Sequence, residues 1–217
     1  MKQLHERSPH EKMIQEQLVD RGIRNARVLA AIRSTPREFF FSPDMRAHAH
    51  ADRAAPIGHG QTISQPYIVA LMTQHLDVQS TDRVLEIGAG SGYQTAILAR
   101  LAAEVYTIER IKPLLDEAFE RLMTLGLRHV HLRYGDGTLG WPDAAPFDRI
   151  LIAAGAPDLP TSLFLEQLRD GGIAVLPVGP LHEQMLVEIH RHGSNLERVD
   201  ICPCRFVKLI GKAGWAE

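Results

Sequence analysis

The sequence predicts an α/β fold with a doubly wound, mostly parallel sheet, an N-terminal helical segment and a C-terminal antiparallel addition. From residue 66 onward, short apolar segments alternate with helical ones, which is typical of a parallel sheet covered by helices on both faces. A glycine cluster follows the first of these apolar segments. Of the 217 residues, 45% are hydrophobic and 23% are charged, which is the composition of a globular chain and not of a disordered one.

Residues 1–65 are expected to form N-terminal helices and a loop packed on a core of residues 66–217, together one structural domain. Apolar residues predict a helix over 13–19 that ends at Gly22, and a second helix over 25–33 that Pro36 stops. The three phenylalanines at 39–41 are expected to pack in the core. Residues 42–65 lose periodicity, and a loop this long is commonly functional. We expect it to cover a bound ligand.

The core segments follow in order. Helices are predicted over 68–76, 93–101, 113–125 and 161–168, and strands over 83–87, 104–109, 130–133, 147–152 and 173–176. The last two strands, 185–190 and 205–210, are expected to form the antiparallel addition. In such a sheet the ligand crevice lies at the carboxyl ends of the strands.

Charge and cysteine usage narrow the function classes. With 24 basic and 26 acidic residues the chain has a net charge of −2, so no nucleic-acid partner is expected. Seven charged residues among the first 20 argue against a signal peptide, and no apolar run is long enough to span a membrane. Cys202 and Cys204 are too few for a zinc site and are expected to be reduced thiols. These features favour a cytoplasmic location.

The sharpest chemical signal is the G-x-G-x-G loop of Gly88, Gly90 and Gly92 between a strand and a helix. It differs from the G-x-G-x-x-G of dinucleotide sites. Glu86 precedes it, and an acid there suits a cofactor that carries an ammonium and a sulfonium group. The cofactor that fits this description is S-adenosylmethionine.

Two further acids are placed to hold this cofactor. Glu109 ends the second strand, 17 residues after Gly92, where a carboxylate accepts both ribose hydroxyls. Asp136 follows the third strand, where it can accept a hydrogen bond from the adenine amino group, and Gly137 lets the backbone approach the ring. Together these loops indicate a class I, Rossmann-like methyltransferase. They leave open a binding module that senses S-adenosylmethionine without turnover, and they do not name the methyl acceptor.

Upstream and downstream motifs carry a resemblance to a known family. They are Pro36-Arg-Glu-Phe39, Pro56-Ile-Gly-His-Gly-Gln-Thr-Ile-Ser-Gln-Pro66, Leu85-Glu-Ile-Gly-Ala-Gly-Ser-Gly-Tyr93, Gly135-Asp-Gly137, Pro146-Phe-Asp148, Leu176-Pro-Val-Gly179 and Arg205-Phe-Val207. In this order, over roughly residues 18 to 210, the chain resembles the protein-L-isoaspartate O-methyltransferases. The G-Q-T-I-S-Q-P string is the most specific of the motifs.

The resemblance implies a cytosolic, monomeric repair enzyme. Such an enzyme transfers a methyl group from S-adenosylmethionine to the α-carboxylate of L-isoaspartyl residues in damaged proteins, and the ester collapses through a succinimide toward aspartate. The resemblance places Ser64 on the family's active-site serine and Thr62 and Ile63 beside it in the substrate loop. It places the cofactor on six positions: Glu86, Gly88, Gly90, Gly92, Glu109 and Asp136.

The chain departs from the family pattern at the rim of the pocket. His50 stands where the family commonly has an aromatic residue, and Thr138 stands where it often has another. His50 is therefore a candidate substrate-binding residue, and these changes bear on peptide preference more than on the reaction. A methyltransferase that acts on aspartate in one dedicated peptide partner remains an alternative.

The reaction itself asks for alignment and not for a base. A carboxylate with a pKa near 4 is about 99.9% ionised at pH 7, and a sulfonium methyl is already activated. Ser64 is therefore expected to orient the carboxylate by a hydrogen bond and not to attack as a nucleophile. His48, His50, His59 and Asp52 could be imagined as a metal site, but the reaction needs no Lewis acid, and no metal is expected.

Overall fold

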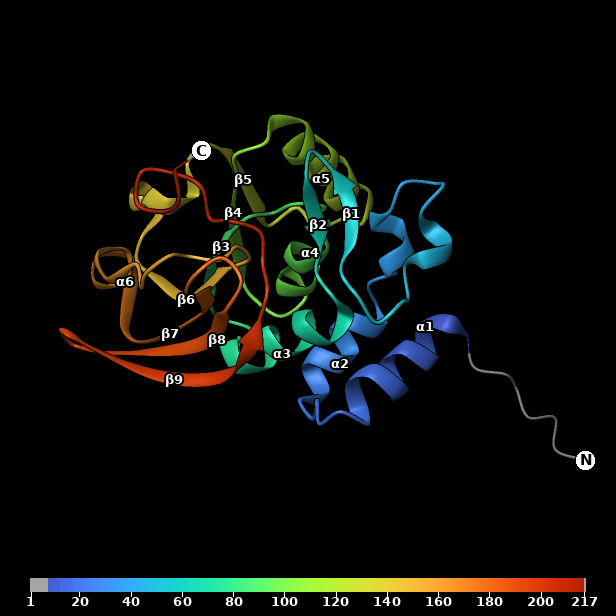
Figure 1. Cartoon of the computed structure of the whole chain (residues 1–217), viewed down its shortest axis with the longest axis horizontal. Coiled ribbons are helices and arrows are strands. Elements are labelled where there is room, and N and C mark those ends of the chain that lie inside the picture. Colours follow the sequence, from blue (N-terminus) through green and yellow to red (C-terminus); the bar gives the residue numbers. More distant parts are fainter. Residues whose placement is uncertain (1–7, 217) are drawn as a thin grey trace, which may run out of the picture.

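Seven strands form one sheet in the order β5-β4-β3-β6-β7-β8-β9 in the computed structural model, which describes residues 8–216 (Figure 1). Residues 1–7, part of the charged stretch that argues against a signal peptide, lie outside the described residues. The strands are β3 (Arg83–Ile87), β4 (Glu104–Glu109), β5 (Val130–Tyr134), β6 (Phe147–Ile152), β7 (Leu168–Val178), β8 (Gln184–His192) and β9 (Asn195–Cys204). The first five are parallel, and β8 and β9 are antiparallel additions, so the predicted fold class is confirmed.

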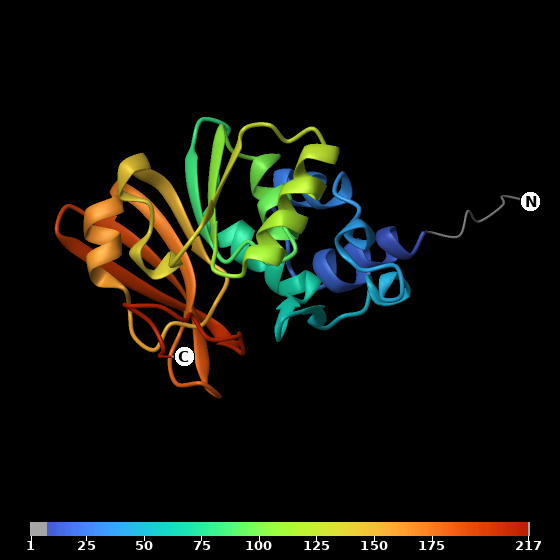
Figure 2. The same cartoon turned by 90° about the horizontal axis from the view of Figure 1, so that it is seen from above.

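Helices cover both faces of the sheet (Figure 2). The helices are α1 (Pro9–Lys12), a π-helical continuation (Met13–Val19), α2 (Ala26–Arg33), α3 (Pro66–Leu76), α4 (Tyr93–Ala99), α5 (Lys112–Thr124) and α6 (Thr161–Gln167). Strand residues alternate between the faces, because successive side chains of a strand point to opposite sides. In β3, Val84 packs with α2, α3 and α4, whereas Leu85 packs with α6.

The N-terminal helices share their core with the sheet. Leu18 and Phe40 belong to the same buried cluster as Val84 and Tyr93. The rings of Phe40 and Tyr93 meet edge to face, with centroids 5.3 Å apart. Phe40 and Phe41 are buried as expected, and Phe39 is half-buried at the edge of the same cluster.

The segment 42–65 contains a hairpin that the sequence did not predict. Strands β1 (Ala55–Gly58) and β2 (Gln61–Ile63) pair antiparallel around a turn in which His59 has a φ of 51°. Short 3₁₀ turns at Arg37–Phe40 and Arg46–His48 precede it. Strands of three or four residues are too short to show an alternating pattern, and this explains the omission.

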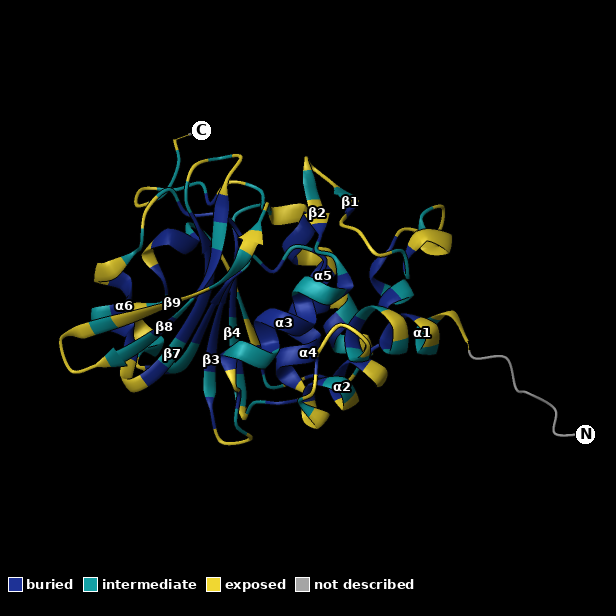
Figure 3. Ribbon diagram, turned by 60° about the horizontal axis from the view of Figure 1, so that its bottom comes forward, coloured by how far each residue is buried: buried dark blue, intermediate teal, exposed yellow. Residues whose placement is uncertain are grey.

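The predicted strand 205–210 is wrong. The partner of β8 is β9, and its residues are mostly exposed because it is the edge strand of the sheet (Figure 3). An edge strand with polar side chains gives no apolar signal in the sequence. Residues 205–210 instead run along the carboxyl end of the sheet, where Lys208 makes an isolated bridge to Gly155. Among the described residues, no helix is both long and apolar enough to cross a membrane.

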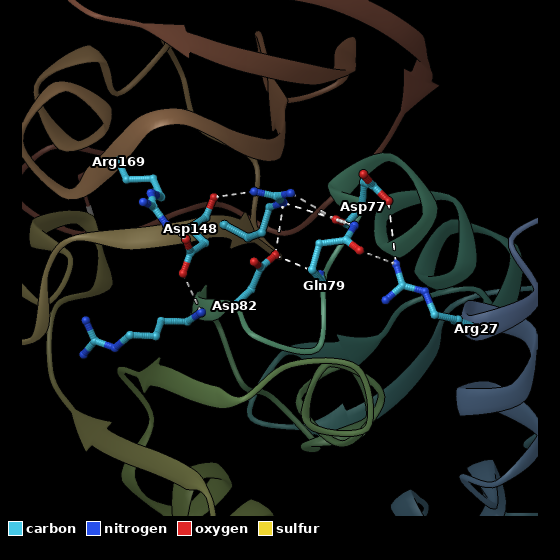
Figure 4. A network of polar contacts seen from close by, with 8 residues as sticks. Arg27, Asp77, Gln79, Asp82, Asp148 and Arg169 are labelled. Atoms are coloured by element: carbon cyan, nitrogen blue, oxygen red, sulfur yellow. Dashed lines mark hydrogen bonds and ion pairs between the residues drawn. The ribbon is translucent and has the colours of Figure 1, made fainter.

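A polar network fixes the opposite end of the sheet, at the amino ends of β3 and β6 (Figure 4). The carboxylate of Asp148 accepts a hydrogen bond from the Arg83 backbone N–H at 2.8 Å and pairs with Arg169. Asp82 pairs with Arg149 at 3.5 Å and accepts from the Gln79 backbone N–H at 2.8 Å. The loops at this end are held by ion pairs, and the glycine loop lies at the other end.

Candidate functional site

A cavity lies at the carboxyl ends of β3, β4 and β6. The glycine loop and the end of β4 form its floor, and the β2 strand and the segment after β9 form its walls. It is lined by residues 61–64, 87–91, 108–111, 137, 153–154 and 207–210, with Val69, Met72, Tyr93 and Gln94. This is the position at which doubly wound sheets bind their ligands. Thr62, Ile63, Ser64, Gly88, Gly90, Glu109 and Gly137 were predicted from the sequence and all line it.

At two glycines of the site, Gly92 and Gly137, the neighbouring atoms leave no room for a side chain. Gly92 has a φ of 87°, and a Cβ there would lie 3.2 Å from the Cβ of Ala118, so it lets α4 begin against α5. Gly92 therefore shapes the loop without lining the cavity. A Cβ on Gly137 would lie 2.4 Å from the Cγ2 of Ile87, at the cavity wall. The absence of a side chain there lets the loop after β5 pack directly against Ile87.

Glu109 is oriented for a diol. Its Oε2 accepts a hydrogen bond from the Gly90 N–H and its Oε1 accepts one from the Ile111 N–H, both at 2.9 Å. Only 6% of the residue is exposed. Each carboxylate oxygen can accept more than one hydrogen bond, so both can still receive a hydroxyl from the cavity side. The Glu109 carboxylate is therefore suited to accept the two ribose hydroxyls of S-adenosylmethionine.

Glu86 lies beneath the cavity and does not line it. Strand alternation turns its side chain toward α4, where Oε2 accepts hydrogen bonds from the hydroxyls of Thr95 and Thr107. Oε1 is buried and has no hydrogen-bond partner among the described residues. Burial raises the pKa of Glu86 to about 7, aided by the charge of Glu109 and opposed by the two threonines. The carboxyl is therefore partly protonated near neutral pH.

The contacts of Asp136 in the structure differ from the hydrogen bond to adenine that its sequence position predicts. Its Oδ1 accepts hydrogen bonds from the N–H and hydroxyl of Thr138, and its Oδ2 accepts one from the Lys212 N–H at 2.8 Å. It is not among the residues that line the cavity. The carboxylate thus ties the C-terminal segment to the loop after β5. In the same segment, Trp215 Nε1 donates to the Gly155 carbonyl at 2.9 Å.

Arg37 supports Ser64 and was not identified from the sequence as a site residue. Its side chain is completely buried, and Nη2 donates to the Ser64 carbonyl at 2.6 Å while Nε donates to the Ala49 carbonyl at 2.8 Å. The guanidinium carbon lies 4.7 Å from the centre of the Tyr93 ring. Burial lowers the pKa of Arg37. The sequence feature that could have identified Arg37 as a site residue is its place in the Pro36-Arg-Glu-Phe39 motif.

A second, outer cavity adjoins the first. Asp52, Arg53, Gln65 and residues 203–207 line it, and Thr62, Ser64, Ala153 and Val207 line both cavities. Ser64 therefore stands at the boundary between an inner cavity beside the glycine loop and an outer one open to the surface. Residues 205–207 of this wall were predicted as the start of a strand, so their contribution to a cavity was missed.

His50 lines neither cavity. Its Nε2 lies 3.2 Å from a carboxylate oxygen of Glu38, and its ring meets the ring of His10 edge to face at 5.5 Å. Burial lowers the pKa of His50, against the opposing effect of Glu38. The structure thus places it behind the Ser64 loop. Thr138, the second departure, is buried and donates its N–H and hydroxyl to Asp136, the N-cap of the 3₁₀ turn Gly137–Leu139.

Comparisons with known proteins agree with this geometry. Residues 7–214 match the family model described as protein-L-isoaspartate(D-aspartate) O-methyltransferase. The chain is 52% identical over 202 residues to a protein-L-isoaspartate O-methyltransferase of Dictyoglomus thermophilum, covering 93% of this chain and 91% of that one. It is 49% identical over 205 residues to one of Geobacter metallireducens, covering 94% of each.

The fold has a solved counterpart. A protein-L-isoaspartate O-methyltransferase from Plasmodium falciparum, in complex with S-adenosyl-L-homocysteine, superposes with a TM-score of 0.82 and 23% identity. The match covers 94% of this chain and 99% of that chain. At this level of identity the match shows the fold, including the order of strands and the C-terminal addition.

Replacement of Glu86 by Gln should remove a pH dependence of stability. Because the folded-state pKa of about 7 lies above the ordinary 4.5, the folded chain binds this proton more tightly than the unfolded one. The contribution of protonated Glu86 to the free energy of unfolding is fully present below the ordinary pKa of 4.5. It is lost as the pH rises to about 7, which is a difference on the order of 3 kcal/mol. Urea unfolding from about pH 5 to about pH 8 should show wild type losing stability relative to Glu86→Gln. Glu117 is exposed, so the control variant Glu117→Gln should show the same dependence of stability on pH as wild type. The same dependence in all three proteins would contradict a raised pKa of Glu86.

Proposed function

Because the chain belongs to the protein-L-isoaspartate(D-aspartate) O-methyltransferase family, we propose that its inner cavity holds S-adenosylmethionine and its outer cavity holds the isoaspartyl residue. The protein is an S-adenosylmethionine-dependent carboxyl methyltransferase that acts on L-isoaspartyl residues of damaged proteins, as its sequence motifs predicted. The methyl ester it forms leads through a succinimide to aspartate.

The observation that carries the proposed arrangement is the shared wall of the two cavities. Thr62, Ser64, Ala153 and Val207 face both spaces, so a group in the outer cavity can meet a group in the inner one at this boundary. The inner cavity adjoins the glycine loop and Glu109, and the outer one opens between the Ser64 loop and residues 203–207. A peptide enters from outside while the cofactor lies against the sheet.

In the inner cavity, Gly88 and Gly90 allow the backbone to approach the cofactor, and Glu109 receives its ribose hydroxyls. Gly137 lines the same cavity and, because it has no side chain, packs closely against Ile87 where the adenine would lie. Glu86 and Asp136 act indirectly, the first from beneath the loop and the second through the C-terminal segment. S-adenosylmethionine, when bound, supplies an electrophilic methyl group.

In the outer cavity, the protein must align a carboxylate that is already ionised. Ser64 provides a hydroxyl at the boundary and orients the attacking oxygen, while Arg37 fixes the backbone of Ser64 from behind. Arg53 and Arg205 are among the residues that line the same cavity, and their positive charges attract an anionic acceptor. Asp52, which also lines it, is paired with Arg21 at 3.0 Å, which reduces its repulsion of that acceptor.

The substrate is a protein or peptide that contains isoaspartate. We further propose that the enzyme acts as a monomer in the cytoplasm and has no nucleic-acid partner. The near-neutral charge and the two free cysteines support this view. Size-exclusion chromatography with light scattering tests the monomer directly.

Two synthetic peptides that differ only in isoaspartate or aspartate at one position test the function. We expect methyl transfer to the isoaspartyl peptide, with at least a tenfold lower rate on the aspartyl peptide, because one methylene moves the carboxylate away from the boundary. Radiolabelled methyl transfer measures both. Equal rates, or transfer to the aspartyl peptide alone, would contradict the repair function, and cofactor binding without transfer to either would indicate a sensor.

Replacement of Glu109 by Gln should weaken cofactor binding. It removes charge-assisted hydrogen bonds worth about 1.5 to 3 kcal/mol, so the dissociation constant for S-adenosylhomocysteine should rise about 10- to 150-fold. Calorimetry measures it, and circular dichroism checks that the fold is kept. Glu104 begins the strand that Glu109 ends, so Glu104→Gln is a matched control that should bind normally. An unchanged affinity in Glu109→Gln would remove Glu109 from the cofactor site.

Replacement of Ser64 by Ala should reduce turnover efficiency on the isoaspartyl peptide by about 10- to 150-fold, with little change in cofactor affinity. This is the value of one hydrogen bond to a charged group, about 1.5 to 3 kcal/mol. Loss of a covalent nucleophile would be far larger. Ser42→Ala, an exposed serine of the same segment that lines neither cavity, serves as the control. Wild-type activity in Ser64→Ala would exclude Ser64 from the mechanism, and near-total loss would exclude a purely orienting role.

A further inference from the structure

Three separate segments bring metal-ligating side chains together behind the Ser64 loop. His10 comes from α1, Glu38 from the 3₁₀ turn at Arg37–Phe40, and His50 from the chain that leads to the hairpin. One ligand atom of each lies within 4.8 Å of the corresponding atoms of the other two. These residues are 12 to 40 positions apart in the sequence, and neither cavity of the methyl-transfer site is lined by any of them.

Several buried polar atoms of this cluster lack a hydrogen bond to the described residues. Both ring nitrogens of His10, Nε2 of His50 and Oε2 of Glu38 are buried and make no hydrogen bond with the described residues. The last two atoms lie 3.2 Å apart and form an ion pair with each other when His50 is protonated, whereas the two nitrogens of His10 have no such contact. Buried polar atoms are almost always paired in proteins, and an isolated exception is often explained by a bound ion or water. The two nitrogens of His10 remain unpaired beside the His50–Glu38 pair, and one cation shared by the three side chains would satisfy them.

We propose that His10, Glu38 and His50 bind a divalent transition metal ion, of which Zn²⁺ fits best. Two imidazoles and one carboxylate are a common zinc ligand set. Bonds of about 2.0 to 2.2 Å place tetrahedral ligand atoms roughly 3.3 to 3.6 Å apart. The His50–Glu38 separation of 3.2 Å lies just below this range, and the other separations require shifts of at most about 1.5 Å, which side-chain rotation supplies.

The metal would act on structure and not on the reaction. It would join α1 to the Glu38 turn and to the chain before the hairpin. Arg37, next to Glu38, holds the carbonyls of Ala49 and Ser64, so the same turn carries both the metal ligand and the support of Ser64. Gln17 also donates to the His50 carbonyl at 2.8 Å, which adds the π-helical segment to the assembly. The ion would therefore stiffen the base of the substrate loop.

Titration of the metal-free full chain with Zn²⁺, followed by calorimetry and native mass spectrometry, tests the proposal. We expect one ion per chain with a dissociation constant in the micromolar range or below. His10→Ala, Glu38→Gln and His50→Ala should each weaken binding at least about tenfold. His48→Ala is a matched control, because His48 lies two residues from His50 and is exposed.

A second measurement distinguishes metal binding at this site from metal binding at other histidines of the chain. Hydrogen exchange in residues 8–19 and 42–65 should slow when Zn²⁺ is added to wild type, and should not respond in His10→Ala. His75 and His190 flank Glu188 at 2.7 and 2.6 Å and form a competing cluster. Zn²⁺ affinity that is unchanged in all three variants, or protection confined to the region of Glu188, would overturn the proposal, as would the absence of micromolar binding.

Discussion

The buried guanidinium of Arg37 is the constraint on which the acceptor side of the site depends. Burial of a charge is costly unless the charge is hydrogen-bonded, and Arg37 donates from Nε to the Ala49 carbonyl and from Nη2 to the Ser64 carbonyl. Its Nη1 is buried without a hydrogen-bond partner among the described residues, so these two bonds are what hold the guanidinium to the backbone. Its face packs on the ring of Tyr93, the first residue of α4. One side chain thus connects the turn at Arg37–Phe40, the hairpin segment and the helix that follows the glycine loop. Any change in the register of these parts would leave a buried cation without partners, so the position of Ser64 relative to the glycine loop is fixed.

Two glutamates on neighbouring strands show how environment assigns a role to the same side chain. Glu86 lies within β3 and points to the helix-covered face, where two hydroxyls stabilise one oxygen and the other has no partner among the described residues. Glu109 stands one register position beyond the last pair of β3 with β4, at the strand end, and its oxygens receive two backbone N–H groups beside the cavity. The first is suited to bind a proton near neutral pH, the second to accept hydroxyls. Both carry the same chemistry, but Glu86 pairs in register with Thr107, two residues before Glu109, and this offset places the two carboxyl groups in different environments.

The regular part of the fold and the cofactor loop could be predicted from the sequence because their patterns are local. Strands β3, β4 and β6 were predicted with the bounds that the structure shows, since each is a short apolar run next to a glycine or a turn. The hairpin and β9 could not be predicted, because strands of three residues and polar edge strands lack periodicity. The roles of Arg37 and Asp136 were beyond sequence reasoning for a different reason. Each acts on the backbone of a segment 12 to 76 residues away, and such pairings follow from the tertiary fold alone.

The acceptor site is therefore built from the two segments with the least regular structure, and each needs its own anchor. A strand inside the sheet is held by its neighbours along its whole length, but residues 61–64 and 207–210 are held at a few points. Arg37 holds the first, and Asp136, through the Lys212 N–H, holds the segment that continues the second, with Trp215 bound to Gly155 beside it. Thr62 and Ser64 from the first segment and Val207 from the second line both cavities. The distance between these two anchored segments therefore sets the width of the boundary between the cavities. Isoaspartate and aspartate are isomers that differ in the position of one methylene, so in the proposed arrangement this width would help to distinguish them. Arg37 and Asp136 would then bear on the choice of acceptor without lining either cavity.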